Sequence, residues 1–142
     1  MTIARLIEGR SQELVSCDAG MSVREAVALL AERRIGALPV FRGSEIAGIF
    51  SERDVVYQLA AHGPAMLDKT VGEVMTAPAI TVDPGTEVMD ALALMTRRRI
   101  RHLPVVQGGA VRGFVSIGDL VKYRIDRIES EAEAMRSYIQ SA

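Results

Sequence analysis

The chain repeats itself. Residues 15–56 align without a gap to residues 80–121 at an offset of 65, and 17 of the 42 aligned positions are identical. A repeat of this length in a chain of 142 residues indicates two copies of one structural unit. The segment "TIARLI" from Thr2 also matches "TVGEVM" from Thr70, at an offset of 68. Because a unit of about 60 residues buries too little apolar surface to be comfortably stable alone, we expect the copies to pack together.

Both copies carry the same succession of hydrophobic patterns. Apolar residues at helical spacing follow Ser22, which forms a capping box with Glu25, and the second copy repeats this stripe from Val88. Two short β-rich runs joined by a glycine-containing turn come next, and the helical pattern returns after Ser51 and Ser116. We therefore predict an α/β fold of the α+β type, in which each repeat is β-α-β-β-α, a small mixed sheet with two helices.

The repeat also sets the expected domain boundaries. We assign residues 1–63 to the first repeat and residues 64–124 to the second, with a connector at about residues 63–69. Residues 125–142 form a C-terminal extension. Apolar residues recur there at steps of four and three, which predicts a long amphipathic helix: Val121, Ile125, Ile128, Ala132, Met135 and Ile139. Such a stripe needs another surface, either its own core or the same helix of a second subunit, and we expect a homodimer already held by the main domain.

Composition excludes several classes of protein. The hydrophobic fraction of 49% and the charged fraction of 25% are those of a globular protein. The net charge of −1 gives no general attraction to nucleic acid or to anionic membranes. A single cysteine, Cys17, forms no internal disulfide, and His62 and His102 are too isolated for a metal centre. The sequence shows neither a signal peptide nor about 20 consecutive apolar residues, so we expect a cytoplasmic protein without a membrane span.

The runs "GALPVF…GIFSERDV" and "RHLPVV…GFVSIGDL" resemble the cystathionine-β-synthase (CBS) domain. The chain as a whole resembles a stand-alone tandem pair of CBS domains over about residues 1–124, and the resemblance is specific because many motif positions occur twice in register. It implies a pseudo-twofold pair with two clefts between the copies. These clefts would bind adenine nucleotides or related adenosyl ligands, such as AMP, ADP, ATP or NAD, and would report their occupancy to a protein partner.

The sequence "SERD" places a hydroxyl and a carboxylate where a strand ends and a helix begins. Such a helix end attracts anions, because its backbone N–H groups are unpaired. In the family the hydroxyl at this position serves the phosphate and the acid accepts bonds from the ribose. Ser51 and Asp54 match these positions, as do Ser116 and Asp119. The alternative is that each pair only forms a capping box worth about 1 kcal/mol to its helix, and binds nothing.

The two copies differ in their cations. Arg53 of the first copy aligns with Gly118, whereas Arg101 and His102 of the second align with Gly36 and Ala37. In the family each cleft combines the serine and aspartate of one copy with the residues just before "LPV" of the other. That crossing predicts a stronger cleft with Ser51, Arg53, Asp54, Arg101 and His102. By family position, its adenine slot lies near Thr70, Ala79 and Ile80. Plain core packing is the alternative for these last three. The weaker cleft would hold Ser116, Asp119, Gly36 and Ala37, without such a cation.

These features favour a regulatory module that binds an adenine nucleotide and signals its occupancy by a conformational change. The alternative is a structural dimerisation module with vestigial clefts. An enzyme is disfavoured, because the sequence has neither a phosphate loop of the Gly-x-x-x-x-Gly-Lys kind nor a convincing pair of nucleophile and base. We therefore expect no catalytic residue and no catalytic cofactor, and the sequence leaves open whether magnesium accompanies the nucleotide.

Overall fold

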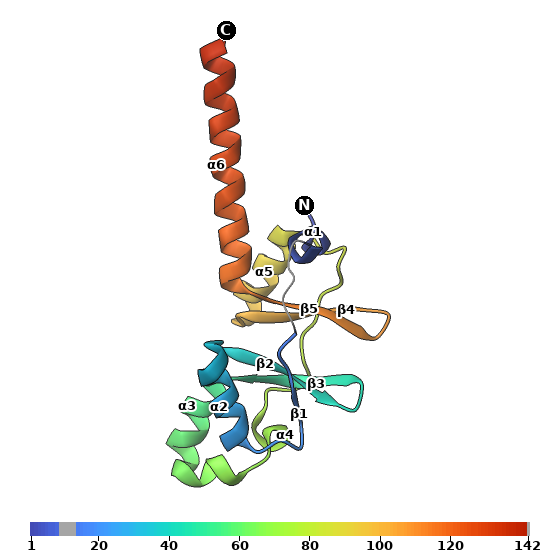
Figure 1. Cartoon of the computed structure of the whole chain (residues 1–142), viewed down its shortest axis with the longest axis vertical. Helices are drawn as coiled ribbons and strands as arrows, with labels where there is room; N and C mark the ends of the chain where they lie inside the picture. Colours follow the sequence, from blue (N-terminus) through green and yellow to red (C-terminus); the bar gives the residue numbers. More distant parts are fainter. Residues whose placement is uncertain (9–13, 142) are drawn as a thin grey trace.

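The computed structural model describes residues 1–8 and 14–141. Two α+β repeats lie one above the other with their β-hairpins facing each other, and a long helix projects from one of them (Figure 1). The first half of the chain forms α1 (Ile3–Glu8), β1 (Cys17–Asp18), α2 (Val23–Arg33), β2 (Ala37–Arg42), β3 (Glu45–Ser51) and α3 (Glu52–His62). The second half forms the 3₁₀ helix η1 (Gly63–Asp68), α4 (Val71–Val74), α5 (Val88–Arg98), β4 (His102–Gln107), β5 (Ala110–Ser116) and α6 (Ile117–Ser141).

The predicted fold class is confirmed, with one difference between the repeats. In the first repeat β1 runs parallel to β2 and makes a three-stranded sheet of order β1-β2-β3. The second repeat keeps only a single bridge from Val82 to Val105 beside the two-stranded sheet of β4 and β5. The N–H of Ala19 donates to the carbonyl of Phe41 at 2.9 Å. Its counterpart in the repeat is Pro84, which has no N–H, so the ladder cannot continue there.

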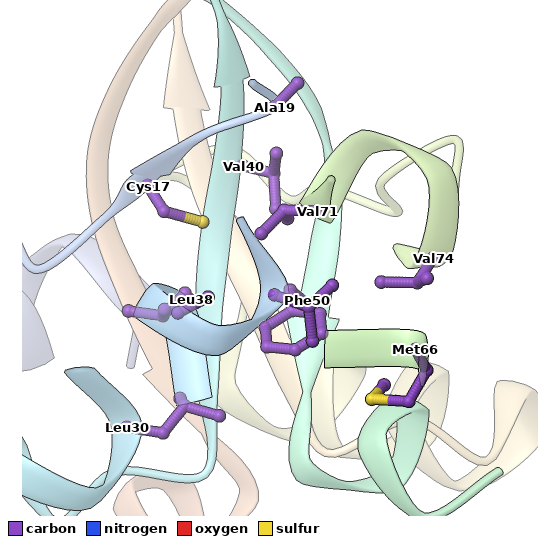
Figure 2. Packing of buried hydrophobic residues seen from close by; sticks show 11 residues of the cluster. Cys17, Ala19, Leu30, Leu38, Val40, Phe50, Met66, Val71 and Val74 are labelled. Carbon is purple, nitrogen blue, oxygen red and sulfur yellow. The ribbon is translucent and has the colours of Figure 1, made fainter. Parts of the chain in front are cut away.

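Each repeat lends its opening segment to the core of the other. The N–H of Ile3 donates to the carbonyl of Thr86 at 2.9 Å, and Ile3 is fully buried in the core of the second repeat. In the other direction, the N–H of Val71 donates to the carbonyl of Met21 at 2.8 Å. Figure 2 shows Val71 and Val74 packed beside the strands of the first repeat. The boundaries at 1–63 and 64–124 thus describe the two copies in the sequence, whereas the two cores cross them.

The connector between the copies belongs to the first core. Its 3₁₀ helix places Met66 among the fully buried side chains, and Figure 2 shows Met66 and Phe50 in the same cluster. Cys17 lies in this cluster too and is 4% exposed. Burial, and secondarily the Asp18 carboxylate, raises the pKa of the Cys17 thiol to about 11, so that it stays protonated at neutral pH. Cys17 therefore acts as a small core residue.

The C-terminal amphipathic helix is confirmed, and it begins earlier than residue 125. Helix α6 starts at Ile117, and its Leu120 is fully buried in the second core. Tyr123 in the next turn still packs against this core, and the remainder of the helix projects away from the body of the protein (Figure 1). Ala142, the last residue of the predicted extension, lies outside the described residues. None of the helices in residues 1–8 and 14–141 has the length and apolar character needed to cross a membrane.

A matched pair of glycines tests the exchange of opening segments. A Cβ on Gly48 would lie 2.6 Å from the backbone carbonyl oxygen of Thr76, whereas a Cβ on the equivalent Gly113 would meet only the Ile7 side chain at 3.4 Å. We expect Gly48→Ala to lower the free energy of unfolding by about 1–3 kcal/mol, as overpacking usually does, and Gly113→Ala to lower it by much less. Urea denaturation of both variants measures this difference, and equal losses would show that the segment around Thr76 is not held against β3.

Candidate functional site

Helix α3 begins at a reciprocal pair of side chain and backbone contacts. The carboxylate of Asp54 accepts from the backbone N–H of Ser51 at 2.9 Å and from its hydroxyl at 3.1 Å, and the Asp54 N–H lies 3.4 Å from the Ser51 hydroxyl. Helix α6 repeats this arrangement, because Asp119 accepts from the Ser116 N–H at 2.8 Å and the Asp119 N–H donates back at 3.1 Å. The capping boxes are therefore real, and each holds a carboxylate at a helix N-terminus, facing a cleft.

Thr76 is a further member of the first pair, and it was not predicted from the sequence. Its hydroxyl donates to the second oxygen of Asp54 at 2.9 Å. The backbone of Thr76 pairs with Ile49 of β3 in both directions at 2.9 Å, which fixes the threonine beside the cap. The offset of 68 that relates the opening segments places Glu8 at the corresponding position of the other copy. Thr76 follows α4, at the point where the opening segment of the second repeat pairs with β3. A polar residue at that point was the signal that could have identified it.

A cavity of about 240 Å³ opens beside Ser51 and is called the Ser51 cleft here. Its lining joins the N-terminus of α3 with the residues before β4 and with the segment after Thr76. The lining residues are Gly36, Ile49, Ser51, Glu52, Arg53, Asp54, Tyr57, Thr76, Pro78, Ala79, Ile80, Ile100, Arg101 and His102. The structure thus brings together every residue predicted for the stronger cleft except Thr70.

Thr70 lies elsewhere because it caps a different helix. Its backbone N–H donates to the Glu73 carboxylate at 2.7 Å and its hydroxyl does so at 3.2 Å, at the start of α4. These two bonds lower the pKa of Glu73 below its ordinary value. Thr70 also pairs with Ser22 in the first repeat. The structure therefore does not place Thr70 in the Ser51 cleft as expected, and the threonine in that lining is Thr76.

The lining of the Ser51 cleft combines charged and apolar residues. The charged residues are Glu52, Arg53, Asp54 and Arg101. The apolar residues include Ile49, Pro78, Ala79, Ile80, Ile100 and the ring of Tyr57. Ile49 shares a face of β3 with Ser51, since side chains two apart on a strand point the same way. Tyr57 follows Asp54 by one helical turn and is 65% exposed, so its ring lies at the mouth of the cleft.

Arg53 has a structural contact besides its place in the cleft. Its guanidinium donates to the carbonyl of Arg99 at 3.1 Å. Arg99 ends α5 in the left-handed region with φ of 56°, so Arg53 places a cation at the C-terminus of that helix. This bond joins α3 of the first repeat to α5 of the second across the cleft.

A second cavity of about 430 Å³ lies beside Ser116 and is called the Ser116 cleft. It is lined by Ile7, Leu14, Val15, Arg34, Ile35, Gly36, Ala37, His102, Arg112, Gly113, Phe114, Ser116 and Asp119. All four residues predicted for the weaker cleft are therefore together.

The expectation that this second cleft lacks a cation is wrong. Arg112 shares a face of β5 with Phe114 and Ser116, and its counterpart in the first repeat is Ala47. Arg34 ends α2 in the left-handed region, with φ of 53°, immediately before the segment that lines the cleft. Both arginines lie outside the two motifs on which the expectation was based. Each cleft therefore has two guanidinium groups among the described residues of its lining.

His102 lies between the two clefts and lines both, as Gly36 does. Its ring stacks on Phe114 with centroids 5.5 Å apart and an interplanar angle of 13°. Burial lowers the pKa of His102 below its ordinary value; the carboxylates of Asp119 and Glu52 oppose this shift and Arg101 adds to it. His102 is therefore part of the wall of both clefts.

The described part of the chain offers no ready metal centre. Within residues 1–8 and 14–141, no group of three or more His, Cys, Asp or Glu side chains is placed to hold a metal ion.

Known proteins are similar to this chain in sequence and in fold. The family model for the CBS domain matches twice, at residues 10–61 and 71–126. The mitochondrial CBS domain-containing protein CBSX3 of Arabidopsis thaliana is 36% identical over 129 residues, which are 87% of this chain and 63% of that protein. This chain thus spans less than two thirds of the length of that relative.

Solved structures agree. A protein with CBS domains from Burkholderia ambifaria is 37% identical, with a TM-score of 0.83 over 89% of this chain and 95% of that one. CBSX2, solved in complex with AMP, is 27% identical with a TM-score of 0.74, over 88% of this chain and 96% of that one. The duplicated hairpins, the paired helix caps and the two family matches together show that the chain belongs to the CBS domain family, as a tandem pair of these domains.

Proposed function

We propose that this protein is a regulatory module that binds an adenine nucleotide in the Ser51 cleft, and a second adenosyl ligand in the Ser116 cleft. One observation carries the proposal: the lining of a single cavity combines the N-terminus of α3, the oriented carboxylate of Asp54, two arginines and a set of apolar side chains. A nucleotide has the matching parts, since its phosphate is anionic, its ribose offers hydroxyl donors and its base is flat and apolar on both faces.

Each part of the ligand has a place in this proposal. The phosphate lies at the start of α3, where the positive end of the helix dipole, Arg53 and Arg101 attract an anion. The ribose hydroxyls donate to Asp54, where they compete with the Thr76 hydroxyl for one carboxylate oxygen. The base occupies the wall between Ile49 and Ile80, with Tyr57 at the mouth. The solved complex of CBSX2 with AMP supports this choice of ligand class.

We favour AMP, ADP or ATP over NAD. The Ser51 cleft, of about 240 Å³, lies below the range of about 300–1,000 Å³ common for small-molecule sites, and the Ser116 cleft, of about 430 Å³, lies in the lower part of that range. Each suits one mononucleotide, whereas a dinucleotide would have to extend out of its cleft. Ligand binding would change the packing of the two repeats, and a protein partner would detect this change. The size of the shift between two packing states is limited by the difference in the affinity of the ligand for them.

We also propose that two copies of the chain associate. Several large apolar side chains on α3 and α6 are exposed, among them Val56 and Tyr57. The alternative function is that of a dimerisation module, held together by these helices, that binds no ligand. The capping boxes favour this alternative, because their carboxylates already accept hydrogen bonds without a ligand.

A thermal unfolding experiment distinguishes the two functions. A ligand that binds only the folded protein stabilises it by RT ln(1 + [L]/Kd), which is about 2.7 kcal/mol at a hundredfold excess over Kd. We expect AMP, ADP or ATP to raise the Tm by several degrees, and inorganic phosphate to raise it much less. An unchanged Tm with every adenosyl compound at millimolar concentration would leave the dimerisation module as the function.

Paired variants of the two aspartates assign the clefts. Asp54→Asn keeps an acceptor for the helix cap but removes the charge, so we expect it to weaken nucleotide binding in the Ser51 cleft by about tenfold. Asp119→Asn should do the same in the Ser116 cleft and leave the first site unchanged. Isothermal titration calorimetry with AMP resolves the two sites, and identical isotherms for the wild type and both variants would contradict the assignment.

Arg101 gives a test that is specific for the phosphate. Arg101→Ala should weaken AMP binding in the Ser51 cleft by about tenfold to a hundredfold, because a charge-assisted contact is lost. Adenosine has no phosphate, so its affinity should stay nearly the same in this variant. Arg112→Ala is the matched control, since it alters only the Ser116 cleft. An equal loss for AMP and adenosine would place Arg101 away from the phosphate.

A further inference from the structure

Helix α6 carries an apolar stripe along the part that leaves the body. Ile125 is 49% exposed, Ile128 is 48% exposed and Ile139 is 66% exposed. The full stripe comprises Val121, Ile125, Ile128, Ala132, Met135 and Ile139, at steps of four and three. This spacing is the seam of a two-stranded coiled coil, in which such residues occupy the a and d positions of a heptad.

Charged residues border this seam in a definite order. Taking Ile125 as an a position, Arg124 and Glu131 lie on one border, at g, and Glu129 and Arg136 lie on the other, at e. In a parallel coiled coil a g residue faces the e residue five positions later in the partner helix. Basic and acidic residues are therefore spaced to attract each other between two copies of α6.

We propose that a second copy of this chain covers the stripe, with the two α6 helices parallel and in register. Six apolar layers then form, from Val121 to Ile139. Arg124 pairs with Glu129 of the partner subunit, and Glu131 pairs with Arg136 of the partner subunit. Twofold symmetry repeats both pairs, so the seam has four interhelical ion pairs. Within one chain Glu131 contacts Arg127 at 3.3 Å, and in the dimer it lies between two arginines.

Antiparallel pairing fits the same residues less well. The antiparallel register that keeps all six layers brings Glu129 against the partner's Glu129 and Lys122 against the partner's Arg136. Another antiparallel register matches the charges, with Lys122 against the partner's Glu129, but it retains only the four layers between Val121 and Ala132. Only the parallel register satisfies the apolar and the charged positions together.

The parallel seam gives the proposed homodimer a defined orientation. This inference rests on the proposed association of two copies. It does not depend on nucleotide binding, which is measured separately. The seam does connect the dimer interface with the Ser116 cleft, because α6 also supplies Asp119 to that cleft. Asp119 lies less than one helical turn before Val121, where the seam begins. A rotation or shift of α6 at the cleft would be transmitted along the paired helices.

Charge reversal on the full chain tests the register. Glu129→Lys replaces two attractions by two repulsions, so we expect the dimer dissociation constant to rise by about tenfold. Adding Arg124→Glu to the same chain restores both pairs in the parallel register, and the dissociation constant should return to within about threefold of the wild type. Glu133→Lys makes the same charge change away from the seam and serves as the control. Sedimentation equilibrium measures all four proteins, and calorimetry with AMP checks that nucleotide binding is unchanged.

The charge-matched antiparallel register predicts the opposite for the double variant. In that register the carboxylate introduced at position 124 would meet the partner's Glu131, and the amine introduced at position 129 would meet the partner's Lys122. A double variant that dimerises more weakly than Glu129→Lys alone would therefore overturn the proposal, as would a monomeric wild type at tens of micromolar.

Disulfide trapping gives an independent measurement. Ala132→Cys should cross-link two subunits on mild oxidation, since position 132 meets its own copy only in the parallel register, and Glu133→Cys should not. Failure of Ala132→Cys to cross-link in a dimeric protein would also overturn the proposal.

Discussion

Each hydrophobic core of this protein is completed by the opening segment of the other repeat. Ile3 is fully buried with the second repeat and Val71 with the first, and backbone hydrogen bonds hold both segments in place. A repeat of about 60 residues has too little core of its own, so this exchange supplies apolar surface that neither copy has alone. The exchange also ties the two repeats together on both sides. The clefts depend on it, because Ile7 and Thr76, which line opposite clefts, both belong to the exchanged segments.

The two clefts are alike in design and different in composition. Each begins at a Ser-x-x-Asp cap and each has two arginines in its described lining, but the arginines come from different positions: Arg53 and Arg101 in one cleft, Arg34 and Arg112 in the other. Both caps are formed, and each stabilises the start of its helix, α3 or α6. His102 and Gly36 lie in both linings, so the two clefts share part of a wall.

Much of the fold could be predicted from the repeat, and less of the site. The helices, the hairpins and the long C-terminal helix follow from hydrophobic period, which depends only on local sequence. The weakened first strand of the second repeat was missed, although Pro84 in place of Ala19 explains it. Thr70 was assigned to the cleft from its position in the family pattern, yet its hydroxyl caps α4. Thr76 and Arg112 were missed because their approach to the clefts depends on strand pairing and not on proximity to a motif.

The sequence by itself determined that the chain contains two copies of one α+β unit, that each copy has a carboxylate and a hydroxyl at a helix start, and that α6 has a seam of apolar residues. These properties repeat at fixed local spacings in the sequence, and such spacings do not depend on how the two copies are arranged in space. Only the tertiary structure decided which segment completes which core, and which arginines face which cleft. Those contacts join residues tens of positions apart, and their partners are chosen by packing across the two repeats, which no local pattern records.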